Sequence, residues 1–101
     1  MALNRVNNVV YATAADRLAG RLLIVGVVMT STAANAVMNI FDDDTGAPAV
    51  ANTVLQARIA AADETRFFDL SLIPIRIEDA LNIGTLTNAA VTVIIKEMGS
   101  V

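Results

Sequence analysis

Adjacent carboxylates are the side chains of this sequence best suited to chemistry. They occur in three groups, Asp42–Asp44, Asp63-Glu64 and Glu78-Asp79. Two carboxylates can serve as general acid and general base when they converge on one substrate. Neighbouring residues of an extended strand point to opposite faces, so these groups are poorly placed to converge. We therefore expect turns rather than catalytic pairs at these positions.

The Asp42–Asp44 group could also offer oxygen ligands to calcium. An EF-hand would need a longer loop with alternating oxygen ligands and a terminal Glu, and the sequence lacks this pattern. We interpret the group as a solvated acidic turn that ends a strand and discourages pairing at a sheet edge.

Several residue types that carry enzymatic chemistry are missing from the sequence. It contains no Cys and no His, so thiol nucleophiles, Ser-His-Asp triads and ordinary zinc sites are excluded. The five glycines are scattered and form neither a phosphate loop nor a dinucleotide fingerprint. We therefore expect a protein that is not an enzyme, with no catalytic residue, no metal and no cofactor.

Composition points to an assembly. Hydrophobic residues make up 55% of the 101 residues and charged residues only 17%, with a net charge of -3. Nucleic-acid binding needs clustered Lys or Arg, and no such cluster is present. A sugar platform needs exposed aromatic rings, and Tyr11 is the single tyrosine beside three phenylalanines. The apolar content exceeds what one small core needs, which favours an oligomer or a component of a larger particle.

The stretch Leu22–Met29, with the sequence LLIVGVVM, is the most apolar part of the chain. It is too short for a membrane span, which takes about 20 apolar residues, and because Met1–Asn8 is polar we do not expect this segment to be a signal peptide. Its branched residues and turn-like flanks predict a central strand over Leu22–Thr32, apolar on both faces. Gly26 in its middle predicts a bulge or a close backbone approach.

Short strands with turn residues between them continue to the end of the chain. We expect them at Ala36–Phe41, Thr53–Ala61, Arg66–Ile73, Ile75–Ile77 and Ala89–Glu97. The segment Glu78–Ile83 is ambiguous and is expected to end at Gly84, whereas Ala12–Ala19 and Ala57–Ala62 could instead form short helices. This spacing predicts an all-β protein, an antiparallel β-sandwich of the jelly-roll-like or Ig-like kind. Period-two alternation assigns eight residues to its interior: Leu55, Ile59, Phe68, Leu70, Leu72, Val91, Val93 and Ile95.

The N-terminus differs in composition from the rest. Residues 1–12 are polar and Asn-rich until Val9, Val10 and Tyr11, so we expect an N-terminal arm followed by a single sandwich domain over residues 13–101. The arm is expected to contact another chain and to contribute little to the fold. Candidate contacts with other subunits or a capsid are the apolar residues of the arm and two outward strand residues: Val9, Val10, Tyr11, Phe67 and Ile94.

The order of these segments along the chain resembles that of a known protein family. The carrying segments are RLLIVGVV at 21–28, VMNIFDD at 37–43, the alternating strand at 53–61, the Phe-rich strand at 66–72 and AAVTVII at 89–95. Together they resemble the small β-sandwich decoration, or cement, proteins on the heads of tailed bacteriophages. The resemblance covers about Arg21 to Lys96. It is based on the pattern of apolar and polar residues in these segments and not on a signature motif.

The resemblance implies a structural virion protein. Its partners would be other copies of itself, as a homotrimer, and the major capsid protein, with no nucleic acid and no membrane. It would lie on the outer capsid surface and stabilise the head lattice. Two alternatives stay open: a head–tail adaptor or tail-associated structural protein, and a carbohydrate- or receptor-binding module on the particle surface.

Overall fold

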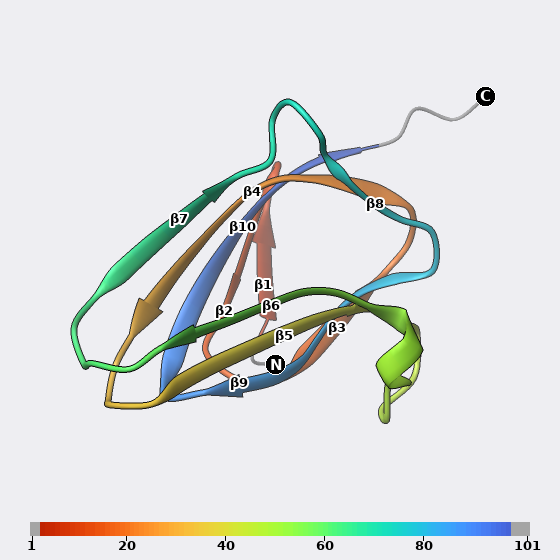
Figure 1. The fold of residues 1–101 in the computed structure, drawn as a ribbon. Coiled ribbons are helices and arrows are strands. Elements are labelled where there is room, and N and C mark those ends of the chain that lie inside the picture. Colours follow the sequence, from red (N-terminus) through yellow and green to blue (C-terminus); the bar gives the residue numbers. More distant parts are fainter. Residues whose placement is uncertain (1–2, 98–101) are drawn as a thin grey trace.

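A computed structural model describes residues 3–97, which form ten β-strands and one short 3-10 turn (Figure 1). The elements in chain order are β1 (Leu3–Val6), β2 (Val9–Ala12), β3 (Asp16–Ala19), β4 (Leu22–Ser31), β5 (Ala36–Asp42), η1 (Val50–Asn52), β6 (Thr53–Ile59), β7 (Thr65–Asp69), β8 (Ile75–Ile77), β9 (Ala80–Thr87) and β10 (Ala89–Glu97). They pair antiparallel in two sheets that face each other. The predicted all-β antiparallel sandwich is confirmed.

Sheet A has the strand order β1-β2-β10-β4-β7, and β8 also pairs with β4. β7 and β8 follow one another along the same edge of β4, opposite Gly26–Thr30 and Leu22–Ile24 respectively. Sheet B has the order β3-β9-β5-β6. The β10–β4 pair therefore forms the centre of sheet A, and β9–β5 the centre of sheet B.

β4 is the predicted central strand, and its side chains alternate between buried and half-buried positions. Ile24, Val27 and Met29 point into the core with no exposed surface. The register against β10 shifts between Ile94 and Ile95, which face Gly26 and Ile24, so Val25 is an extra residue. This is the irregularity that Gly26 predicts.

The core between the sheets contains most of the predicted interior residues. Ile59, Val91, Val93 and Ile95 are buried, and three more pack partly buried against the core: Leu55, Phe68 and Leu70. The assignment of Leu72 is wrong, because this side chain is 95% exposed. β7 ends at Asp69, three residues before it, and the alternation ends with the strand.

The N-terminal segment is part of the sandwich. β1 and β2 form a hairpin through Asn7, whose positive φ of 54° suits Asn, and β2 pairs with β10 along four residues. Val10 and Ala12 point into the core and are fully buried. The expectation that Met1–Tyr11 contributes little to the fold is therefore wrong from β2 onward. Met1 and Ala2 lie outside the described residues.

Two local expectations are also corrected. The alternative helices do not form within the described residues, because Asp16–Ala19 is strand β3 against β9 and Thr53–Ile59 is strand β6. β9 does not end at Gly84 but runs through it to Thr87. Gly84 is the extra residue at a register shift against β5, and a Cβ there would lie 2.6 Å from Phe41 Cε1. Glycine is needed here because the Phe41 ring covers the backbone.

Candidate interaction surface

The outer face of sheet A, the side turned away from sheet B, gathers most of the predicted contact residues. Cross-strand pairing places Tyr11, Thr92, Val28 and Phe67 in one row across β2, β10, β4 and β7. Val6, Val9, Ile94 and Gly26 form the next row. We call the apolar members of these rows the apolar stripe: Val6, Val9, Tyr11, Val28, Phe67 and Ile94.

The stripe is accessible to a partner. Val6 is 70% exposed and Phe67 59%, while Tyr11 and Val9 are 44% and 39% exposed. Surface hydrophobic residues are ordinary when they are scattered, whereas a contiguous group marks an interaction site. Four of the five contact residues predicted from the sequence lie in this group.

Val10 is the exception among the predicted contacts. It alternates with Val9 and Tyr11 along β2, so its side chain points into the sandwich and has no exposed surface. Its prediction as a contact with another chain is wrong. Val6 and Val28 were missed, because their positions depend on pairing with β2 and β7, which a single segment does not reveal.

Gly26 makes the stripe continuous across β4. A Cβ built on Gly26 would lie 3.3 Å from both Ile94 Cδ1 and Phe67 Cε1. The side chains of Ile94 and Phe67, on the two flanking strands, therefore both lie against the Gly26 position, which is itself buried. A larger residue would have to push these two side chains apart.

Polar side chains surround the stripe. Thr30 and Thr65 hydrogen-bond through their hydroxyls at 3.1 Å on the next row, and Asp69 flanks Gly26 on β7. At the opposite end Lys96 and Arg76 flank Leu23. An apolar centre with a polar rim is the usual composition of a protein interface.

The outer face of sheet B is polar by comparison. Gln56, Asn39 and Thr85 form one row across β6, β5 and β9. Arg58 and Thr87 flank the single apolar residue Val37 in the next row. The two outer faces of the sandwich therefore differ in chemistry, and only the sheet A face offers an apolar stripe.

The interpretation of Asp42–Asp44 as a solvated turn is wrong for Asp43, which is buried, and the carboxylates of both Asp42 and Asp43 hold neighbouring backbone. The Asp42 carboxylate accepts backbone N–H bonds from Glu78 at 3.0 Å and Asp79 at 2.8 Å, which ties the β8–β9 turn to the end of β5. Asp43 is buried, and its carboxylate accepts bonds from the residues that shape the 43–52 loop: Thr45 Oγ1 at 2.7 Å, Ala49 N at 2.9 Å and Asn52 Nδ2 at 2.9 Å.

These bonds account for the electrostatics of the turn. The Ala49 backbone N–H, followed by the Asn52 amide and the Thr45 hydroxyl, lowers the pKa of Asp43 below its ordinary value. Donors stabilise the charged carboxylate, and here they outweigh the opposing effect of burial. Asp44 points elsewhere and pairs with Arg17 at 3.2 Å. Within residues 3–97 no group of acidic side chains converges to hold a metal ion.

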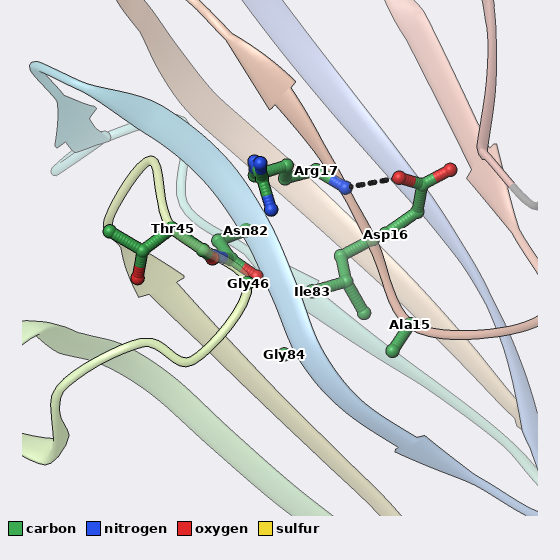
Figure 2. Close-up of a pocket in the computed structure, with 8 residues that line it drawn as sticks. All are labelled: Ala15, Asp16, Arg17, Thr45, Gly46, Asn82, Ile83 and Gly84. Atoms are coloured by element: carbon green, nitrogen blue, oxygen red, sulfur yellow. Dashed lines mark hydrogen bonds between the residues drawn. The ribbon is translucent and has the colours of Figure 1, made fainter.

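A pocket of about 250 Å³ lies beside this turn, between β3, β9 and the 45–46 segment (Figure 2). Its polar side chains are already engaged. The Asp16 carboxylate accepts the Arg17 backbone N–H at 2.8 Å, and the Asn82 amide donates to the Asp43 and Thr45 carbonyl oxygens, each at 2.8 Å. The pocket is thus lined by bonds that hold the turn, and we assign no ligand to it.

Comparison with protein-family models, curated proteins and solved structures finds no match for this chain. Over the described residues, no helix has the length and apolar character needed to cross a membrane. The contrast between the two outer faces is the feature of the described residues from which a function can be proposed.

Proposed function

We propose that this protein is a structural virion protein that binds the outer capsid surface and stabilises the head lattice without catalysing a reaction. The observation that supports this function is the contrast between the apolar outer face of sheet A and the polar outer face of sheet B. A protein with one apolar face can lie against a shell through that face and present the other to solvent.

The chemistry of the stripe suits a repeated, passive contact. Phe67 and Tyr11 supply large apolar area at opposite ends of one row, and aromatic residues are enriched in interface centres. A single copy needs only modest affinity for the shell. Copies that are linked to one another bind several lattice sites at once, so their combined affinity is much higher. The partners in this proposal are the major capsid protein and further copies of the chain, assembled as a homotrimer on the capsid of the virion.

The experiment compares particles that carry the protein with particles that lack it. We expect both to assemble, and the particles without it to release their contents at a lower temperature. Adding the purified protein should restore the higher temperature, and adding the Phe67→Ser variant should not. Val50→Ser is the matched control, because Val50 is 83% exposed but lies on η1, away from the stripe.

Two outcomes would contradict the proposal. Particles with and without the protein could release their contents at the same temperature but differ in tail attachment, which would favour the head–tail adaptor. They could instead differ only in adsorption to cells, which would favour the carbohydrate- or receptor-binding module.

A further inference from the structure

The segment between β7 and β8 carries the most exposed large apolar side chain of the described residues and, directly after it, a second strongly exposed one. Leu72 is 95% exposed and Ile73 is 82% exposed. We call residues 71–74, which contain both, the knob. In Figure 1 the connection between β7 and β8 rises beyond the edge of the sheet as a narrow protrusion. Two adjacent large apolar residues this exposed, on a protrusion, indicate a contact with another molecule.

The knob is an excursion from a continuous sheet edge. The Leu70 N–H donates to the Val25 carbonyl at 3.0 Å, and Ile75 then pairs with Ile24, the next residue of β4. The four residues between them therefore leave the edge and return to it. The Asp69 carboxylate accepts the Ser71 N–H at 3.0 Å, and Pro74 restricts the return, so the excursion has a defined shape.

A groove of matching character lies at the other end of β7. It has a volume of about 300 Å³, and its accessible lining consists of the apolar residues Val37 and Ala60 together with Asn35, Arg58 and Arg66, with the fully buried Ala36 and Ile59 beneath them. Arg66 is near the start of β7, whereas the knob follows its end. A strand of five residues spans about 17 Å, so a chain cannot place its knob in its own groove.

The charges at the two places are opposite. Four of the six arginines form ion pairs, namely Arg5, Arg17, Arg21 and Arg76. The other two, Arg58 and Arg66, line the groove and have no ion-pair partner within the described part of the chain. Asp69 stands at the base of the knob, where its carboxylate is bonded to the Ser71 amide but to no cation among residues 3–97.

We propose that the knob of one copy inserts into the groove of a second copy, with Leu72 and Ile73 in the groove and Asp69 facing Arg58 and Arg66. This contact rests on the proposed function and deepens the self-association that it includes. It joins different surfaces of the two copies. Such a contact forms a closed ring when the rotation between copies closes and an open filament when it does not, and the homotrimer of the proposed function is the closed case. None of the six apolar residues of the sheet A stripe takes part in this contact, and Asp69 lies beside Gly26 at the rim of the stripe.

The test uses the purified full chain without particles. Wild-type protein should sediment as a closed oligomer at micromolar concentration. The knob variant Leu72→Ser/Ile73→Ser and the groove variant Arg58→Glu/Arg66→Glu should each be monomeric. All four side chains are exposed in the single chain, so neither variant should lose its fold. Loss of one buried aliphatic side chain alone should weaken self-association by about tenfold to a hundredfold.

Mixing the two variants gives the sharper result. The groove variant keeps its knob and the knob variant keeps its groove, so the mixture should form a heterodimer with a single contact. Val50→Ser should sediment like the wild type. A monomeric wild type, variants that keep the wild-type mass, or a mixture that stays monomeric would each overturn the contact.

The same samples distinguish the knob contact from lipid binding and from the capsid function. Leu72-dependent co-sedimentation of a monomeric wild type with vesicles of phosphatidylcholine and phosphatidylglycerol would show that the knob binds lipid, and would overturn the proposal. If the knob contact fails these tests but the wild-type protein still stabilises particles against heat, the proposed capsid function is unaffected. Suppose instead that the wild type is an oligomer and the knob variant a monomer, but that the wild-type protein gives particles no added heat stability. This result would reject only the capsid function.

Discussion

The Phe67 ring on β7 reaches diagonally across to β4 and lies over Gly26. Phe67 pairs directly with Val28, yet its Cε1 atom lies 3.3 Å from the place a Gly26 Cβ would occupy. Diagonal contacts of this kind are within reach of aromatic side chains in antiparallel sheets. Its neighbour Phe68 points the other way and packs against the core. Two adjacent phenylalanines thus have separate roles, one outside and one inside.

The first prediction separates these two rings. Phe68→Ala should lower the free energy of unfolding by about 2–3 kcal/mol, somewhat less than a fully buried ring, because Phe68 is only partly buried. Phe67→Ala should change it by about 0.5 kcal/mol or less. Urea unfolding of both variants gives the comparison. Reversed effects would mean that the register of β7 is shifted by one residue.

The second prediction concerns Gly84. An alanine Cβ there would lie 2.6 Å from Phe41 Cε1 and 2.8 Å from Pro48 Cγ, so both rings would have to move. Overpacking of this kind costs about 1–3 kcal/mol, and urea unfolding of Gly84→Ala should show a loss of that size. Gly46→Ala is the matched control, because its Cβ would meet only Arg17 Nη1, at an ordinary 3.6 Å. Equal effects of the two substitutions would refute the close approach at Gly84.

The third prediction is a pH dependence from Asp43. The pKa of its carboxyl is lowered in the folded chain, so its contribution to stability is present above the ordinary carboxyl pKa and is lost as the pH falls through the folded value. Asp43→Asn should therefore be less stable than wild type at pH 7, and the difference should shrink below about pH 4. Urea midpoints measured at a series of pH values provide the test.

Asp44→Asn serves as the control for this experiment. Asp44 belongs to the same turn, but its ion pair with Arg17 is exposed and should contribute little at pH 7. If Asp43→Asn and wild type differ equally at all pH values, the carboxylate does not carry the pH dependence.

Local pattern was sufficient to predict the centre of the fold. β4 and β10 are rich in branched residues, and Val91, Val93 and Ile95 alternate as their burial requires. Leu72 was misplaced because the alternation of Phe68, Leu70 and Leu72 continues past the point where the chain leaves the edge of β4. Pro74 was the one local sign that this strand is interrupted.

The interaction surface was predictable only in part. Phe67 and Ile94 each alternate along their own strand with residues that point into the core. Their outward direction can therefore be predicted from the sequence of that strand alone. Their meeting over Gly26 depends on three strands that are far apart in the sequence. Val10 shows the opposite error, because its burial comes from pairing with Val93 near the other end of the chain.

The last prediction divides the N-terminal segment in two. Deleting residues 1–7 removes β1, whose side chains at Asn4, Arg5 and Val6 are exposed, and spares the Asn8 carbonyl that accepts the Ile95 N–H at 2.8 Å. This variant should keep its strand content and its cooperative unfolding.

Deleting residues 1–12 should have a different result. It also removes β2, which contributes the buried Val10 and Ala12 and covers the edge of β10. Removing one buried Val-sized side chain costs about 1.5–3 kcal/mol by transfer alone, and small domains have only about 5–15 kcal/mol in total. The uncovered edge of β10 would also be free to pair with other chains. Circular dichroism and thermal melts should show a folded 8–101 chain and an aggregating or unfolded 13–101 chain. A stable, cooperative 13–101 chain would show that residues 1–12 are a separate arm after all.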